Sequence, residues 1–223
     1  MLICSIILAA GRSRRMGAQK LLLPFAGGTV IGHIVAEILS SPVDRALVVV
    51  GRDAARIAGA LAGRPVTLVA SDDPDGDMLS SVRCGLRALP PQCDAVLVAL
   101  GDQPSITADL VGRMVDAFRA GGRGIVVPVH GGRPGHPILF STRYRDEVLT
   151  RYDKLGLRGL RQAHPEDVLE LDWPSPAVLA DMDRSEDYRR ELARRQEGNA
   201  TQLKPVRGGS PHPPRQKWPG LDP

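Results

Sequence analysis

A loop rich in cations follows the first apolar segment of the chain. Its four basic residues, within nine positions, are Arg12, Arg14, Arg15 and Lys20. The preceding Leu8-Ala9-Ala10-Gly11 contains small residues, so its backbone can approach a ligand closely and turn free N–H groups toward phosphate oxygens. Guanidinium and ammonium groups add charge-assisted hydrogen bonds to such an anion. The segment predicts a polyphosphate site, although a solvated basic loop would have the same composition.

This loop matches neither of two common phosphate-binding patterns. No glycine precedes Lys20 and no serine or threonine follows it, so the loop is not a Walker A motif. It also lacks the GxGxxG spacing and the ribose-binding acid of dinucleotide-binding folds. Any phosphate chemistry must therefore use a different arrangement.

Two acidic segments could supply the metal that polyphosphate chemistry needs. Asp102 lies in Gly101-Asp-Gln-Pro104, directly after an apolar run, and its carboxylate is suited to hold Mg²⁺ against phosphate oxygens. A second acid is available in Asp181-Met182-Asp183. Simpler roles remain open, because Asp102 could form a turn or cap the next helix, and Asp183 could cap a helix beginning near Ser185.

Short apolar runs that alternate with helical segments predict how these loops are positioned. The predicted strands are Ile3–Ala9, Ala46–Val50, Val66–Ala70, Ala95–Leu100 and Ile125–Val129, with little polar alternation, as in strands buried on both faces of a parallel sheet. The predicted helices are Val30–Leu39, Ala54–Ala62, Leu79–Leu89 and Ile106–Arg119. This order predicts an α/β fold, a single domain with a doubly wound, Rossmann-like and mostly parallel sheet. Ligands bind such sheets at the carboxyl ends of the strands.

The second half of the chain has shorter predicted elements. Strands are expected at His136–Phe140, Val168–Leu171 and Ala177–Asp181, and helices at Leu155–Gln162 and Glu186–Arg195. We place residues 1–195 in one domain. Residues 196–223 contain six prolines, four glycines and only five hydrophobic residues, too few to offset the entropy of ordering. We therefore expect a basic, Pro/Gly-rich disordered tail.

The charge distribution argues against nucleic acid as a ligand. The formal charge is +4 and the sequence pI is about 9.2. Residues 189–195 carry +3 and residues 196–223 carry +2, which leaves −1 for residues 1–188. With only 4% aromatic residues, the body lacks the basic, stacking surface of a nucleic-acid-binding protein.

Cysteine usage and apolar runs indicate a cytoplasmic protein. Three scattered cysteines form neither a disulfide framework nor a CxxC metal site. The apolar residues 1–10 lack the basic start of a signal peptide, and no later run is long enough to cross a membrane. We expect a cytoplasmic monomer or weak oligomer without membrane or nucleic-acid partners.

The motifs together resemble the molybdopterin nucleotidyltransferase-like family of NTP transferases. Residues 8–24 resemble its first loop, and Gly101-Asp-Gln-Pro104 and residues 181–188 resemble its two metal-site motifs, in the right order. The resemblance continues through residues 76–86, 133–137 and 156–158 and covers about residues 1–190. Ala9-Ala10 stands where guanylyl-transferring relatives carry Gly-Gly, which points to the molybdenum cofactor cytidylyltransferase branch. The chain departs from the usual Asp-Ile-Asp-Thr-Pro-Glu-Asp pattern at Arg184 and Ser185.

The resemblance implies a fold like that of nucleotide-diphospho-sugar transferases and a role for each matching position. Arg15, Lys20 and Asp102 would be catalytic, and Asp102 and Asp183 would hold Mg²⁺. The nucleotide would contact Leu8, Ala9, Ala10, Gly11, Arg15, Lys20, Ser80, Ser81 and Gly101. The acceptor would contact Gly135, His136, Pro137 and Arg158.

The resemblance also implies the reaction. Such an enzyme would transfer CMP from CTP to the phosphate of a molybdopterin-type cofactor and release pyrophosphate, with a molybdoenzyme receiving the product. Two alternatives remain open. One is a nucleotidyltransferase that uses another NTP or a small phosphorylated acceptor such as a sugar, polyol or phospholactate. The other is a non-catalytic maturation factor for a molybdoenzyme.

Overall fold

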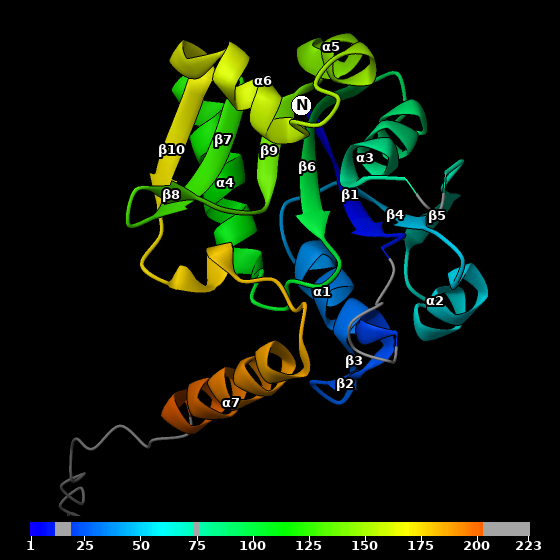
Figure 1. Cartoon of the computed structure of the whole chain (residues 1–223). Coiled ribbons are helices and arrows are strands. Elements are labelled where there is room, and N and C mark those ends of the chain that lie inside the picture. Colours follow the sequence, from blue (N-terminus) through cyan, green and yellow to red (C-terminus); the bar gives the residue numbers. More distant parts are fainter. Residues whose placement is uncertain (12–18, 74–75, 203–223) are drawn as a thin grey trace, which may run out of the picture.

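Alternate residues of the first strand, β1 (Leu2–Ala9), face opposite sides of a central sheet. The computed structural model describes residues 1–11, 19–73 and 76–202 (Figure 1). Ile3 and Ile7 pack in the hydrophobic cluster on one face, whereas Cys4 and Ile6 pack in the cluster on the other. A strand covered on both faces needs apolar residues at successive positions, which explains the continuous apolar run.

The sheet has the order β10-β7-β9-β6-β1-β4-β5, with β8 paired to β7. Its other strands are β4 (Arg45–Val50), β5 (Val66–Ala70), β6 (Cys93–Leu100), β7 (Ile125–His130), β8 (Arg133–Pro134), β9 (Ile138–Ser141) and β10 (Val168–Asp172). The pairs β1–β4, β1–β6, β4–β5 and β7–β10 are parallel, while β9 is antiparallel to β6 and β7. The expected doubly wound, mostly parallel sheet is confirmed.

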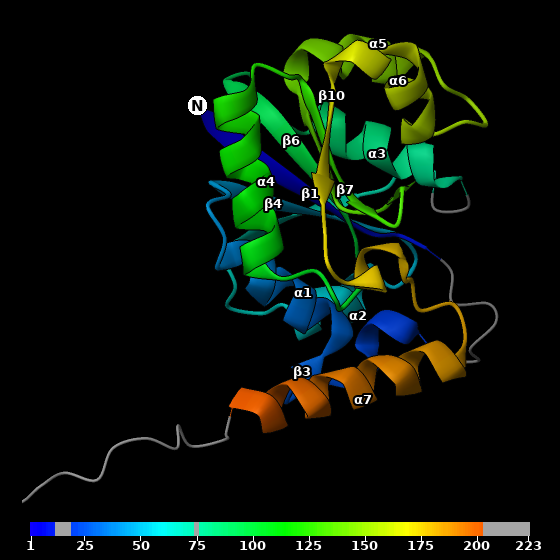
Figure 2. The same ribbon diagram turned by 90° about the vertical axis from the view of Figure 1, so that its left-hand side faces the viewer.

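Helices cover both faces of the sheet. Hydrophobic residues of α1 (Val30–Leu39), α2 (Ala54–Ala60) and α4 (Ala108–Gly121) share one core cluster. Residues of α3 (Met78–Arg87), α5 (Arg145–Thr150) and α6 (Leu157–Ala163) share the other. Figure 2 shows α4 and α3 on opposite sides of the strands. This arrangement leaves the carboxyl edge of the parallel strands for loops.

The loops at this edge lie beside a terminal helix. The 3-10 helix η1 (Lys20–Leu22) leads into the hairpin of β2 (Pro24–Phe25) and β3 (Gly28–Thr29). The last helix of the described residues, α7 (Ser185–Gln202), passes below this hairpin in Figure 2. The Tyr188 hydroxyl donates a 2.6 Å hydrogen bond to the Pro24 carbonyl, which anchors the start of α7.

 

The boundaries differ from prediction in a few places that have physical causes. Val30–Leu39 and Val66–Ala70 are confirmed as a helix and a strand. The strand predicted at Ala177–Asp181 is wrong, because the segment forms the 3-10 helix η4 (Pro176–Leu179). Ser175 is the N-cap of this helix, and its hydroxyl accepts a hydrogen bond from the Ala177 N–H. Pro176 fixes its backbone φ and has no N–H to give to a strand ladder.

Two further expectations need correction. Strand β5 was expected to be buried on both faces, but it is an edge strand, and Leu68 is 39% exposed. The helix predicted at Glu186–Arg195 is longer, because α7 spans Ser185–Gln202. Residues 203–223 of the predicted tail lie outside the described residues. Within the described residues, no helix has the length and apolar character that a membrane span requires.

Candidate functional site

The backbone at the end of β1 is packed against a neighbouring loop. The Gly101 N–H donates a 2.9 Å hydrogen bond to the Leu8 carbonyl, and a Cβ added at Gly101 would lie 2.5 Å from that oxygen. On the other side, a Cβ at Gly51 would lie 2.8 Å from the Ala10 carbonyl oxygen. Only residues without a side chain allow this approach. Ala9 is buried, whereas Gly11 is exposed and opens the chain toward solvent.

Lys20 connects the first loop to both predicted metal-binding acids. Its Nζ atom lies 2.5 Å from Asp102 Oδ2 and 3.0 Å from Asp183 Oδ1. Burial disfavours the charged ammonium, but the two carboxylates outweigh burial and raise the pKa of Lys20. Three residues that are far apart in the sequence therefore form one ion-pair cluster at the carboxyl edge of the sheet.

The helix-capping roles left open for the two acids are taken by other residues, whereas Asp102 does lie in the turn that follows β6. Helix α4 is capped by Thr107, whose Oγ1 accepts a hydrogen bond from the Leu110 N–H. At the start of α7, the Asp187 carboxylate accepts hydrogen bonds from the N–H groups of Asp183 and Arg184. The carboxylates of Asp102 and Asp183 are instead directed at Lys20.

Gln103 holds the segment that carries Asp183 against the loop that carries Asp102. Its side chain is 1% exposed, and Nε2 donates to the carbonyls of Ala177 at 3.1 Å and Val178 at 2.9 Å. The Ser105 hydroxyl also donates to the Ala177 carbonyl, and the Met182 N–H donates to the Asp102 carbonyl. These bonds fix η4 and the residues that follow it beside the β6 loop.

A third acid lies near the pair. Desolvation, followed by the charges of Asp183 and Asp102, raises the pKa of Asp181. Within the residues that the structure describes, no three His, Cys, Asp or Glu side chains gather as a ready-made metal cage. The candidate donor set is therefore the carboxylate pair of Asp102 and Asp183.

Three of the four predicted acceptor-binding residues, Gly135, His136 and Pro137, lie on the segment next to η4, and the fourth, Arg158, lies on α6. The Gly135 N–H donates to the Pro128 carbonyl, and the His136 N–H donates to the Val178 carbonyl, at 2.8 and 2.9 Å. Pro137 is buried. Burial, followed by the charge of Arg161, lowers the pKa of His136, against an opposing effect of Asp102. Val178 thus accepts hydrogen bonds from both the acceptor segment and Gln103.

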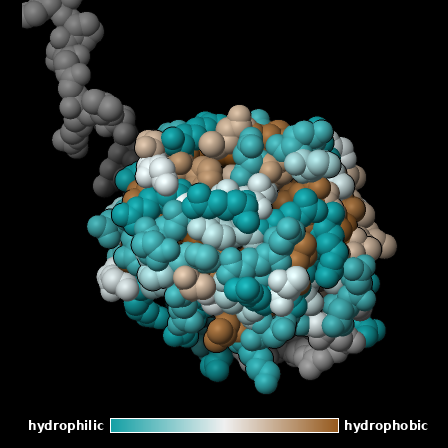
Figure 3. Space-filling view, turned by 90° about the horizontal axis from the view of Figure 1, so that it is seen from above, coloured by the Kyte–Doolittle hydropathy of each residue, from teal (hydrophilic) through white to brown (hydrophobic). Residues whose placement is uncertain are grey.

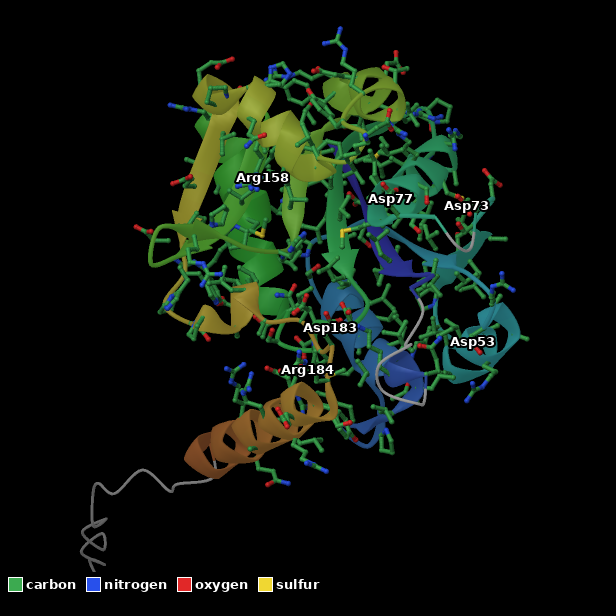
Figure 4. All side chains as sticks on the ribbon, in the orientation of Figure 1. Asp53, Asp73, Asp77, Arg158, Asp183 and Arg184 are labelled. Atoms are coloured by element: carbon green, nitrogen blue, oxygen red, sulfur yellow. The ribbon has the colours of Figure 1, made fainter. Side chains whose placement is uncertain are left out.

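Other predicted residues lie farther from the cluster. Ser80 is in the first turn of α3, where its N–H donates to Asp77 Oδ1 and its hydroxyl donates to the Asp77 carbonyl, both at 2.8 Å. Ser81 is 7% exposed on the same helix. Figure 4 shows Asp77, Arg158 and Asp183 on separate elements, with Arg158 on α6. Arg15 lies outside the described residues, so its role stays a prediction, as do those of Ser80 and Ser81.

Sequence reasoning missed Gln103 and Arg161, whereas it had named Asp181 together with Asp183 as a source of the second acid. Gln103 stands inside the motif that contains Asp102, and its position between an acid and a proline was a usable signal. The contribution of Arg161 depends on the packing of α6 and gave no sequence signal. Gln103 and Arg161 both interact with residues that are far from them in the sequence.

A family model described as the MobA-like NTP transferase domain matches residues 5–168. The chain belongs to this family. Its sheet is that of the nucleotide-diphospho-sugar transferases, as the sequence resemblance implied, and the protein is a nucleotidyltransferase. The family match includes Lys20 and Asp102 and ends before Asp183.

Relatives of this MobA-like protein include two characterised enzymes. It is 28% identical to the molybdenum cofactor cytidylyltransferase of Escherichia coli over 185 residues, which cover 78% of this chain and 93% of that protein. It is 26% identical over 197 residues to the nicotine blue oxidoreductase of Paenarthrobacter nicotinovorans, with 85% and 96% of the two chains covered.

Solved structures resemble most of this chain. Rv0371c from Mycobacterium tuberculosis superposes with a TM-score of 0.77 and 29% identity, covering 86% of this chain and 98% of that one. Its complex with manganese gives a TM-score of 0.73 and 27% identity, covering 86% and 99% of the two chains.

Proposed function

We propose that the protein is a Mg²⁺-dependent cytidylyltransferase that transfers CMP from CTP to the phosphate of a molybdopterin-type cofactor and releases pyrophosphate. The observation that carries this proposal is the contact of Lys20 with both Asp102 and Asp183 beside the end of β1. The similarity to the Escherichia coli cytidylyltransferase over nearly its full length supports the choice of reaction. A product-receiving molybdoenzyme is part of the same proposal.

The carboxylate pair fits a magnesium ion. Mg²⁺ is bound in phosphoryl-transfer sites by one or two carboxylates together with phosphate oxygens and water, so it needs no cage of three acidic side chains. Asp102 and Asp183 would be these ligands, since both already face one cationic atom. The manganese complex of the structural relative Rv0371c is in accord with a divalent cation. When bound, the ion would neutralise charge that develops on the phosphates.

The chain's own residues would bind and orient the donor. The backbone at Ala9–Gly11, held close by Gly101, offers N–H groups to the triphosphate, and Lys20 adds a positive charge beside it. The acceptor phosphate is already an anionic nucleophile near neutral pH, so no strong general base is required. The task of the site is in-line positioning and charge neutralisation.

The acceptor would approach from the segment that holds His136. Its N–H is bonded to Val178, and the carbonyl of Val178 is also bonded to Gln103 of the metal-site loop. This shared carbonyl would hold the acceptor segment at a fixed position relative to the carboxylate pair. Hydride transfer, the chemistry of an oxidoreductase, has no need for the paired carboxylates and their lysine.

Pyrophosphate release tests the proposal directly. Each of the four NTPs is supplied with Mg²⁺, with and without molybdenum-loaded molybdopterin. We expect release with CTP and the cofactor together, and loss of release after EDTA treatment. Equal activity with GTP would move the protein to the guanylyl-transferring branch. Activity with a sugar phosphate or polyol phosphate in place of the cofactor would show that the acceptor is such a phosphate and not the cofactor. No pyrophosphate release with any NTP would refute nucleotidyl transfer by the purified chain.

A further inference from the structure

A polar cavity lies between α6 and β10, apart from the carboxylate pair. Its volume is about 290 Å³, and its lining residues are Arg158, Arg161, Gln162, Pro165, Val168 and Glu170. The surrounding face, seen from above in Figure 3, is covered mainly by hydrophilic residues with scattered hydrophobic ones. The cavity therefore suits a polar ligand better than an apolar one.

The cavity carries an excess of positive charge. Arg158 and Arg161 stand against a single carboxylate, that of Glu170. In the part of the chain that the structure describes, neither guanidinium has a hydrogen bond or an ion pair, although Arg161 is half-buried. Burial, and then the charge of Arg158, lower the pKa of Arg161, whereas Glu170 opposes this effect. A half-buried cation without a partner costs desolvation free energy, which a bound anion would offset.

The position of the cavity relates it to the reaction site. Arg161 and Asp102 both act electrostatically on His136, so a residue of the cavity and a member of the carboxylate pair each lie within electrostatic range of this histidine. Arg158 and Asp183 come from different elements, α6 and the segment before α7, as Figure 4 shows. An acceptor that extends past His136 could reach the two arginines while its phosphate faces Asp102.

Helix α6 is held in place before any ligand binds. The guanidinium of Arg83 on α3 donates to the carbonyls of Val148 and Arg151, at 2.9 and 2.7 Å, and to the Asp153 carboxylate at 2.8 Å. These bonds fix the loop that leads into α6. A fixed cavity loses less entropy on binding than a mobile one.

We propose that the cavity between α6 and β10 is a second anion site, which binds an anionic group of the acceptor at the end remote from its reacting phosphate. The proposal rests on the proposed function and narrows the acceptor to molecules with two separated anionic groups. Arg158 and Arg161 bind the remote anion, and Gln162 and Glu170 offer hydrogen bonds to its polar neighbours. Sugar and polyol phosphates with a single anionic group would leave the arginines unused.

Acceptor kinetics test the site with one variant that removes a positive charge and one that removes a negative charge. In the pyrophosphate assay with CTP and molybdenum-loaded molybdopterin, Arg161→Gln should raise the acceptor KM about tenfold, the effect of one charge-assisted hydrogen bond, with the KM for CTP unchanged. Glu170→Gln should lower the acceptor KM, because it removes the opposing charge. Arg119→Gln is the matched control, since Arg119 is an exposed arginine on α4, across the sheet.

Sulfate binding tests the cavity without turnover. The rise of Tm with sulfate concentration should be smaller for Arg161→Gln than for the wild type and Arg119→Gln, because the first loop contributes equally in all three. If the acceptor KM and the sulfate response of Arg161→Gln both equal those of the wild type, the anion site is wrong while the proposed function stands. If no acceptor is turned over but the sulfate difference persists, the proposed function fails and the cavity still binds anions. If Arg161→Gln raises the acceptor KM but its Tm responds to sulfate like that of the wild type, the cavity binds the acceptor and does not bind free sulfate.

Discussion

Lys20 Nζ lies 2.5 Å from Asp102 Oδ2, so the ammonium that follows the first loop and the carboxylate at the end of β6 form one charged unit. Asp183 joins this unit at 3.0 Å. Each charge reduces the cost of keeping the others in a partly buried site. The same contact makes the ammonium a competitor of any divalent cation for the two carboxylates.

Replacement of Asp102 should abolish most activity without unfolding the protein. Asp102→Asn keeps the size of the side chain but removes the charge of the proposed metal ligand, so we expect turnover to fall about 10²-fold or more, as for the loss of a strong electrostatic contribution. The measurement is pyrophosphate release over a range of Mg²⁺ concentrations. Asp116→Asn, at an exposed position of α4, is the control. Wild-type turnover in Asp102→Asn would contradict the metal assignment.

Replacement of Lys20 should have opposite effects on metal binding and on catalysis. In Lys20→Met the two carboxylates lose their competing ammonium, so Mn²⁺ should bind the nucleotide-free protein about fivefold more tightly, the equivalent of an ion pair of about 1 kcal/mol. Turnover should nevertheless fall, because the cation that faces the triphosphate is gone. Calorimetric titration with Mn²⁺ and the pyrophosphate assay measure the two effects. Weaker Mn²⁺ binding would argue against competition between Lys20 and the metal.

Gln103 should affect both stability and metal affinity. Gln103→Met removes the hydrogen bonds from Nε2 to the carbonyls of Ala177 and Val178, which keep those from Ser105 and His136, so the free energy of unfolding should fall by about 0.5–1.5 kcal/mol. It should also weaken Mg²⁺ activation, because the segment before Asp183 is no longer fixed. Ser105→Ala removes only one hydrogen bond to Ala177 and should have the smaller effect on both quantities. Equal effects of the two variants would show that Gln103 has no special positioning role.

A side chain at Gly101 should disturb the nucleotide loop. Its Cβ would lie 2.5 Å from the Leu8 carbonyl oxygen, a clash that forces the β1 loop away. We expect Gly101→Ala to raise the KM for CTP and to lower Tm. In Gly59→Ala nothing lies within 4 Å of the added Cβ, and this helical site should gain about 0.5–1 kcal/mol of stability. An unchanged KM for CTP in Gly101→Ala would show that the close approach is unimportant for the donor.

His136 should make the protein less stable in mild acid. Its pKa in the folded state lies below the ordinary value of 6.5, because of burial and the charge of Arg161. As the pH falls below about 6.5, the unfolded chain therefore takes up a proton at this position before the folded chain does, and the free energy of unfolding decreases. The decrease ends once the pH is below the folded-state pKa. Chemical denaturation between pH 7 and pH 5 measures it, and His136→Asn should show a smaller decrease than the wild type.

The sequence by itself determined the type of sheet and predicted which residues would carry the chemistry. Ala46–Val50 and Val30–Leu39 were predictable because strand burial and helix periodicity leave local patterns, and Lys20 and Asp102 stand in short motifs next to predicted strands. The acids and the basic loop were expected at the carboxyl edge because parallel strands bring their ends together there. The segment 177–181 was misassigned because a short apolar run with an adjacent proline does not distinguish a strand from a 3-10 helix.

Only the tertiary structure decided which groups meet. The pairing of Lys20 with Asp183 spans 163 positions of the sequence, and the bonds from Gln103 to Ala177 and Val178 span 74 and 75 positions. No local pattern encodes such distances, because they depend on how η4 and α7 pack against the completed sheet. The same is true of Arg158 and Arg161, whose positive cavity exists only once α6 lies over β10. Local sequence specifies residue type and element, whereas relative position is set by the packing of the whole core.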